Sequence, residues 1–145
     1  MSSPSPIPVV APVVAIGAIA FDDDGRVLLV QRAGAPGAGL WTVPGGKLQF
    51  GETLIEGVVR EVREETGLDV EVRDLITVVE RVNDGADGAD PYHYVIHDYL
   101  VRATGGTLAA GDDAADARWV AEDGLAELPL TAGLVEVLDI ARQLR

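Results

Sequence analysis

The sequence predicts a single α/β domain in which helices cover both faces of a mixed β-sheet. Segments with helical spacing of apolar residues are interspersed among several β-rich runs, and no internal repeat is apparent. The chain has 145 residues, of which 48% are hydrophobic, and this is enough to bury one core. We expect residues 1–8, rich in proline and serine, to be a flexible tail and residues 9–145 to be the domain.

Three β-rich runs precede the first helix. Residues 13–21 and 26–32 flank three aspartates and a glycine, and an Asp-Gly pair between apolar runs is typical of a β-hairpin. Residues 33–40 form either a substrate flap or a plain surface connection. Residues 41–43 are expected to form a short strand, with Trp41 in the core, before a turn that contains paired glycines.

The first helix is predicted between Thr53 and Gly67. Thr53 is followed three residues later by Glu56, so that each side chain can accept a hydrogen bond from an unpaired N–H at that end. Gly67 marks the other end. The buried stripe is predicted from the apolar residues that recur at helical spacing, namely Leu54, Ile55, Val58, Val59 and Val62.

Further strands and a second helix are predicted after Gly67. Residues 68–73, 75–82, 92–103 and 117–120 are β-rich, and a brief helical turn is expected at 121–128. In the long strand, alternation places Asp98 on one face and both histidines, His93 and His97, on the other. Two histidines alone do not establish a metal site. The last helix is expected to run to Arg145 from Thr131 as its cap, with Leu134, Val135, Leu138 and Ala141 or Arg142 toward the core.

The first helix carries three acids beside its buried stripe. At about 100° per residue, Glu61, Glu64 and Glu65 lie at the rim of the stripe. Glu56, Arg60 and Arg63 fall on the side expected to face solvent. Gly57 lies on the acidic side, although a glycine inside a helix costs about 1 kcal/mol relative to alanine. Its missing side chain predicts room for something bound against the carboxylates.

The spacing of these acids favours a bound cation. Like charges at this spacing repel by about 0.2–0.5 kcal/mol per pair on an exposed helix. Carboxylate oxygens suit Mg²⁺, which commonly bridges to substrate phosphates. The alternative is a solvated acidic face in which Arg60 pairs with Glu56 and Glu64. That alternative explains neither Gly57 nor the glycine-rich turn before the helix.

Residues 46–68 resemble the sequence motif of the Nudix hydrolases. The motif is Gly-x5-Glu-x7-Arg-Glu-hydrophobic-x-Glu-Glu-x-Gly-hydrophobic, and every fixed position is met between Gly46 and Leu68. The resemblance implies an α/β/α sandwich with a mixed β-sheet. It also implies hydrolysis of a nucleoside diphosphate linked to another group, with Mg²⁺ or Mn²⁺ required.

The resemblance implies roles for individual residues of the motif. The cation would be held by the carbonyl of Gly46 and by Glu61, Glu64 and Glu65. Glu61 is either a metal ligand or the base for the attacking water. Glu61, Glu64 and Arg60 are the expected catalytic residues, and Arg60 would orient a neighbouring glutamate.

Other residues are expected to support this site. Glu52 and Gly67 are structural parts of the motif, and Glu52 alternatively holds the cation through water. Arg32, Gly45 and Gly46 are expected to contact the substrate. An extra carboxylate from outside the motif often completes such sites in the family. The candidates, each alternatively a solvated surface acid, are Glu80, Asp98, Asp112, Asp113 and Asp116.

Composition excludes several other classes of protein. The net charge of −13 and the presence of a single lysine argue against a nucleic-acid partner. The apolar run at residues 9–21 is too short to span a bilayer, so no membrane partner is expected. The chain has no cysteine, which excludes disulfides and a cysteine nucleophile and favours a cytoplasmic protein. A homodimer is left open.

The substrate is expected to be a small-molecule nucleotide. The run 92–99 resembles a strand found in family members that act on ADP-ribose or nucleotide sugars, and this favours such a substrate. An alternative is a house-cleaning enzyme that hydrolyses oxidised nucleoside triphosphates. A second alternative is a non-catalytic module that senses a nucleotide.

Overall fold

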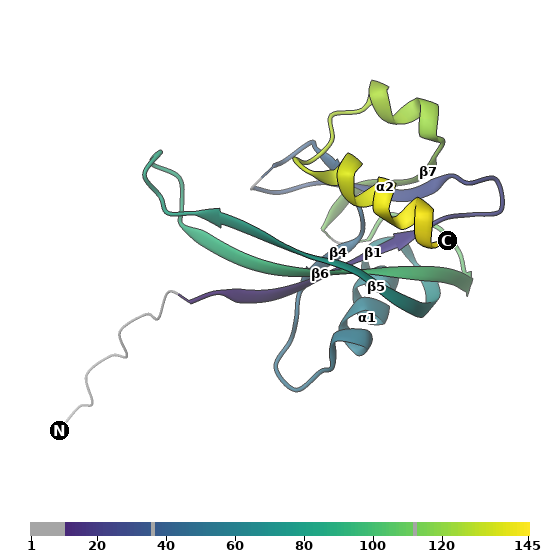
Figure 1. Ribbon diagram of the computed structural model, residues 1–145, viewed down its shortest axis with the longest axis horizontal. Coiled ribbons are helices and arrows are strands. Elements are labelled where there is room, and N and C mark those ends of the chain that lie inside the picture. Colours follow the sequence, from purple (N-terminus) through teal and green to yellow (C-terminus); the bar gives the residue numbers. More distant parts are fainter. Residues whose placement is uncertain (1–10, 36, 112) are drawn as a thin grey trace.

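Two β-sheets and two α-helices make up the computed structural model, which describes residues 11–35, 37–111 and 113–145 (Figure 1). The predicted tail at residues 1–8 lies outside this part. One sheet has the order β4-β1-β6-β5 and the other the order β3-β2-β7. The elements are β1 Val13–Ala20, β2 Val27–Arg32, β3 Trp41–Thr42, β4 Gly45–Lys47, α1 Leu54–Thr66, β5 Leu68–Asn83, β6 Tyr92–Gly106, β7 Ala114–Val120, the 3₁₀-helix η1 Glu122–Glu127 and α2 Leu134–Leu144.

The predicted arrangement of helices on both sides of a mixed sheet is confirmed. β1 pairs antiparallel with β4 and parallel with β6. Ile16 and Ala18 of β1 pack in one core cluster with α1, and Ile19 packs in a second cluster with α2. Successive residues of β1 therefore bury their side chains on opposite faces, as a strand between two layers requires. Trp41 is 3% exposed and belongs to the second cluster, as predicted.

The hairpin predicted at residues 22–25 is only partly formed. The backbone turns there, and Gly25 donates a hydrogen bond to Asp22 O at 3.0 Å. A single bridge, between Phe21 and Val27, joins the two runs. β1 then continues in the four-stranded sheet and β2 in the three-stranded sheet. The local turn was predictable, but the separation of the strands follows from their different partners.

β5 and β6 form a long antiparallel ribbon that extends beyond the rest of the sheet (Figure 1). Two short strands were expected in place of β5. The structure has one continuous strand with irregular pairing near Val70, Asp74 and Thr77. Bulges of this kind let a strand bend without ending, and Asp74 therefore does not interrupt it.

The ends of α1 are as predicted, but its exposed face is not. Thr53 and Glu56 form the capping box, and Gly67 ends the helix in the left-handed conformation with φ of 75°. Val58 and Val62 are buried, whereas Ile55 is 54% exposed, so its placement in the buried stripe was wrong. Its neighbour Leu54 packs against the core cluster instead, so in the first turn the helix directs Leu54 and not Ile55 toward the core.

α2 begins later than expected. Gly133, with φ of 81°, is its N-cap and makes no side-chain capping bond. The predicted cap, Thr131, instead shares a hydrogen bond with the Thr42 hydroxyl at 3.1 Å. Leu134 and Leu138 are buried as predicted, whereas Val135 is 48% exposed and was wrongly placed in the core. Within the described residues, neither helix is long and apolar enough to cross a membrane.

The end of α1 is fixed by a fully buried hydroxyl, that of Thr66. Thr66 Oγ1 donates to Val62 O at 2.6 Å and accepts from the Leu68 N–H at 3.2 Å. Thr66→Val should lower the free energy of unfolding by about 1–3 kcal/mol, because the Leu68 N–H would lose its partner in a buried place. Thr66→Ser keeps the hydroxyl and is the matched control. Equal stability of the valine and wild-type proteins in urea unfolding would contradict this account.

Candidate active site

The acidic ridge of α1, formed by Glu61, Glu64 and Glu65, begins beside the short edge strand β4. Gly46 of β4 lies against Glu61, because a Cβ placed on Gly46 would be 2.6 Å from Glu61 Oε1. Only glycine lets the ridge approach the strand this closely. The structure therefore brings together Gly46 and Glu61, two residues that the sequence predicted to share a site.

Arg60 ties the ridge to the preceding loop. Its Nε and Nη2 donate to the two carboxylate oxygens of Glu52 at 2.9 and 2.6 Å. Nη1 donates to Glu61 at 2.8 Å and to Glu64 at 3.1 Å, and Nη2 also reaches Lys47 O at 3.1 Å. The side chain is 20% exposed, so its placement on the solvent face was wrong. The loop folds over it, which helical periodicity does not reveal.

These contacts shift the pKa values of both partners. Hydrogen bonds from Arg60 and from the Gln49 N–H hold the pKa of Glu52 down to about 2. The Glu52 carboxylate in turn raises the pKa of Arg60 above its ordinary value. Both groups stay charged at any ordinary pH. Glu52 is thus engaged by Arg60 rather than directed at the ridge.

Glu65 is a partly buried acid of the ridge. Burial raises its pKa to about 8, and a hydrogen bond and the charge of Glu61 act in the same direction. The Gly45 N–H and the positive charge of Arg32 act in the opposite direction. Two adjacent carboxyl groups cannot both ionise without strong repulsion. The Glu61–Glu65 pair therefore shares a proton. Arg32 reaches this place from the end of β2, in the other sheet.

Glu64 is oriented differently from Glu61 and Glu65. Its carboxylate is 57% exposed and bonds to Arg60. Among the described residues, no three His, Asp or Glu side chains already converge as a metal centre. The paired glycines lie in strand β4 and not in the predicted turn. The donors nevertheless suit a hard cation, because the oxygens of the Glu61–Glu65 pair face each other beside these glycines and a divalent ion would replace their shared proton.

The space beside Gly57 is filled by protein, contrary to the expectation that it leaves room for a ligand. A Cβ at Gly57 would be 2.8 Å from Leu48 Cδ1 and 3.1 Å from Glu52 Oε1. Gly57 is therefore required by the loop that carries Glu52. The missing side chain serves the Arg60–Glu52 contact and does not form part of a binding site.

The acids considered outside the motif have different environments. Glu80 and Asp113 are exposed, and Asp116 bonds to Arg118 at 2.8 Å. Asp112 lies outside the described residues. Asp98 is buried, 6% exposed, on the sheet face opposite α1. None of the described candidates contacts the ridge in this structure.

One feature of the site had no sequence signal. The loop before β7 caps the C-terminal end of α1, where the Gly111 N–H donates to Glu65 O at 2.8 Å and the Ala109 N–H donates to Thr66 O at 2.9 Å. A Cβ at Gly111 would collide with Glu64 O. The loop thereby fixes the backbone that carries Glu64 and Glu65, which requires tertiary contacts over more than 40 residues of sequence.

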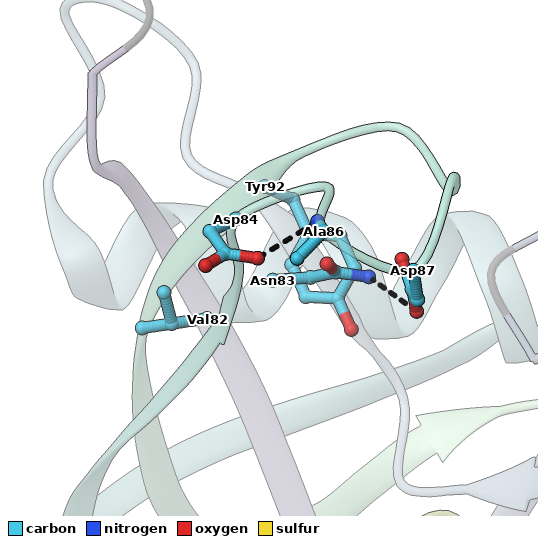
Figure 2. A pocket seen from close by; sticks show the side chains of 6 residues that line it. All are labelled: Val82, Asn83, Asp84, Ala86, Asp87 and Tyr92. Atoms are coloured by element: carbon cyan, nitrogen blue, oxygen red, sulfur yellow. Dashed lines mark hydrogen bonds between the residues drawn. The ribbon is translucent and has the colours of Figure 1, made fainter.

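Among the cavities on the described surface, two have volumes of about 490 Å³ each. One lies at the tip of the β5–β6 ribbon and is lined by Asn83, Asp84, Asp87 and Tyr92 (Figure 2). Its acidic wall does not suit a phosphate. The other lies along α1 and includes Arg60 and Glu64. Only the second cavity adjoins the ridge.

Comparison with known proteins gives a consistent result. A model of the NUDIX domain family matches residues 11–139. The ADP-ribose pyrophosphatase of Methanocaldococcus jannaschii is 37% identical, covering 81% of this chain and 66% of its own length. Human 8-oxo-dGDP phosphatase NUDT18 is 33% identical, covering 88% of this chain and 38% of its own length. The chain therefore spans less than two thirds of either relative.

A solved structure extends the match to the fold. The crystal structure of a MutT NUDIX hydrolase from Burkholderia pseudomallei superposes with a TM-score of 0.77. It is 34% identical, and the match covers 89% of this chain and 97% of that chain. The likeness thus covers most of this chain and nearly all of that one.

Gly46→Ala tests the contact between β4 and the ridge. The added methyl group would displace the Glu61 carboxyl group, so Mg²⁺ should raise the melting temperature much less than in the wild-type protein. The melting temperature in EDTA should change little, because only the end of a side chain must move. Gly34→Ala is the control, since nothing lies within 4 Å of its Cβ. An unchanged Mg²⁺ response in Gly46→Ala would refute the contact's role.

Proposed function

The chain belongs to the Nudix hydrolase family, and from that membership we propose that it hydrolyses the pyrophosphate bond of a nucleoside diphosphate linked to another group. The observation that carries this proposal is the contact of the Glu61–Glu65 pair with Gly45 and Gly46 of β4. It joins two partly buried carboxyl groups to partly exposed backbone at a sheet edge. The carboxylates would repel a diphosphate, so a diphosphate is expected to bind at this place together with a cation.

The residues proposed to hold a divalent cation, Mg²⁺ or Mn²⁺, are Glu61, Glu64, Glu65 and the Gly46 carbonyl. When bound, the cation would neutralise charge on the phosphoryl oxygens and activate water. Glu65 is already fixed by the Gly45 N–H and Glu61 by Arg60. Glu64 would need to leave Arg60 or share it, and its exposure permits that rotation.

The other residues of the site position these groups. Arg60 holds Glu61 in place, and Glu52 holds Arg60 by two hydrogen bonds. Glu61 either completes the ligand set or accepts a proton from the attacking water. Arg32 brings positive charge toward Glu65 from the second sheet, where it would face an anionic substrate.

For the substrate we propose ADP-ribose or a nucleotide sugar. The Methanocaldococcus jannaschii relative, named as an ADP-ribose pyrophosphatase, supports this choice. The human relative, named as an 8-oxo-dGDP phosphatase, favours an oxidised purine nucleotide as the second candidate. A nucleotide sensor without activity is the third candidate, and turnover of any nucleotide would exclude it. A cytoplasmic location and a homodimer stay predictions.

A product screen tests the proposed function. The protein should be incubated with Mg²⁺ or Mn²⁺ and each of ADP-ribose, nucleotide sugars and oxidised or ordinary nucleoside di- and triphosphates. We expect a nucleoside monophosphate from ADP-ribose or a nucleotide sugar, and no product when EDTA is present. Product from oxidised nucleotides alone would favour the second candidate. No metal-dependent product from any compound would refute the hydrolase assignment.

Substitution of the glutamates separates metal binding from proton transfer. Glu65→Gln and Glu64→Gln should each lower kcat by about 100-fold or more and weaken Mg²⁺ binding, because each removes a negative charge from the proposed ligand set. Glu61→Gln should lower kcat with unchanged Mg²⁺ affinity if Glu61 is the base, and lower both if it is a ligand. Glu56→Gln alters only the capping box and is the control. Near wild-type rates in Glu65→Gln would contradict the assigned roles.

A further inference from the structure

Asp98 lies in a row of three residues that crosses the four-stranded sheet. Gly17 of β1 pairs with Asp98 of β6 on one side and with Gly45 of β4 on the other. Ile16 and Ala18, the neighbours of Gly17, pack in the cluster on the α1 side. Alternation along the strand therefore places the Gly17 position and Asp98 on the opposite face of the sheet. The row ends at Gly45, beside the acidic ridge.

The Asp98 carboxylate leans across β1 toward β4. A Cβ at Gly17 would collide with Asp98 Oδ1 and would lie 3.5 Å from Val43 Cγ2. The carboxylate therefore occupies the space that a side chain at Gly17 would fill. This direction points it toward the strand whose Gly45 N–H holds Glu65. Asp98 and the ridge thus approach the same sheet edge from its two faces.

Asp98 is a mostly buried residue that makes no hydrogen bond with another described side chain or backbone group. The side chain is 6% exposed, and no described residue donates a hydrogen bond to it. Arg81 and His97 are the charged and titratable groups that act on it. The Arg81 guanidinium donates instead to Ala132 O at 2.7 Å and to Glu80 O at 3.2 Å.

This burial has an energetic consequence. Burial raises the pKa of Asp98 to about 6, while the charges of Arg81 and His97 act in the opposite direction. The folded protein therefore binds a proton at Asp98 more tightly than the unfolded chain, and stability falls as pH rises from about 4 through 6. At neutral pH the carboxylate is ionised and lowers the stability of the fold. The Asp98 oxygens are not among the fully buried side-chain atoms without a partner, so water or a ligand can reach them and donate hydrogen bonds.

The same sheet face carries groups that suit a nucleoside. Tyr94 and Asp98 alternate onto one face of β6. The rings of Tyr92 and Tyr94 stack with centroids 5.3 Å apart. Lys47 Nζ lies 5.9 Å from the centre of the Tyr94 ring. Aromatic rings beside a cation can bind a base or sugar and a phosphate.

We propose that Asp98 determines substrate specificity by accepting hydrogen bonds from two neighbouring donors on the nucleoside part of the substrate. This inference rests on the proposed function, because it requires a nucleotide whose diphosphate lies beside Gly45. Two groups of a nucleotide present such a donor pair to a carboxylate. They are the cis-diol of ribose and the N1–H and N2–H₂ edge of guanine.

Binding measurements identify which donor pair Asp98 accepts. The affinities of the wild-type protein for GDP, 2′-deoxy-GDP and IDP should be compared by calorimetry in Mg²⁺. If Asp98 accepts from the ribose diol, GDP should bind about 10-fold more tightly than 2′-deoxy-GDP. If it accepts from the base edge, GDP should bind about 10-fold more tightly than IDP. Asp98→Asn should abolish that difference. Glu80→Gln, which removes an exposed charge from the neighbouring strand, should keep it.

The melting temperature of Asp98→Asn distinguishes this proposal from a purely structural role, because the two predict changes of opposite sign. Asp98→Asn should raise the melting temperature at pH 8 by about 3 °C, because it removes a buried charge. The gain should disappear near pH 4, where Asp98 is protonated. Glu80→Gln should not change the melting temperature. A lower melting temperature for Asp98→Asn at pH 8 would overturn the proposal.

The two proposals fail in different ways. If Asp98→Asn leaves every affinity ratio unchanged, or if the wild-type protein does not discriminate among the three nucleotides, the role of Asp98 is refuted whatever the enzyme hydrolyses. If the ratios change as expected but the product screen finds no hydrolysis, Asp98 remains a recognition residue. In that case the hydrolase assignment alone is refuted.

Discussion

The hydrogen bonds of the Arg60 guanidinium are the interaction on which the candidate site depends. One edge of the guanidinium holds both oxygens of Glu52, and the remaining nitrogen contacts Glu61 and Glu64. A single planar cation thus fixes the loop before α1 relative to the acidic ridge. Lysine has no fork of this shape and could not make both contacts in the same orientation. In a chain with a net charge of −13, this one cation also offsets the repulsion within the ridge.

A second constraint is the absence of side chains where elements approach closely. Gly46 lets Glu61 lie against β4, Gly17 makes room for the Asp98 carboxylate, and Gly111 lets the capping loop meet the end of α1. Each glycine permits an approach between neighbouring backbones and side chains that a methyl group would block. These contacts place the ridge, the two glycines of β4 and Asp98 around one edge of the sheet. The geometry of the site therefore depends on these three glycines as much as on its charged groups.

The sequence predicted what depends on neighbouring residues and failed where distant residues compete. Thr53 and Gly67 determine the ends of α1 through local hydrogen bonds, and both were predicted correctly. Thr131 has the chemistry of a cap, but Thr42 from β3 takes its hydroxyl. Ile55 has the spacing of a core residue, yet it is exposed while its neighbour Leu54 packs against the core. Periodicity describes one helix and carries no information about which loop folds over it, so it also misplaced Arg60.

The same limit applies to the site itself. The motif nominated Glu61, Glu65 and Gly46 by their spacing, and the structure shows them in contact. The role of Gly57 was misjudged because its neighbour, Leu48, lies in a loop whose path is not encoded in the helix. Arg32 was expected to contact the substrate, but the effect of its charge on the pKa of Glu65 could not be predicted. Arg32 belongs to the other sheet, and the relative position of the two sheets is determined by both cores together.

Two acids, the partly buried Glu65 and the buried Asp98, lie on opposite faces of the sheet near its β4 edge, and burial raises the pKa of each. The positive charges of Arg32 near Glu65 and of Arg81 near Asp98 act in the opposite direction but do not outweigh burial. Hydrophobic residues at both positions would be expected to give a more stable fold. Stability therefore does not explain why both acids lie near the same sheet edge, whereas a ligand that contacts both of them would explain it. A nucleoside diphosphate has a charged end that needs a cation and a neutral end that offers hydrogen-bond donors, and it could contact both acids by crossing the edge at Gly45.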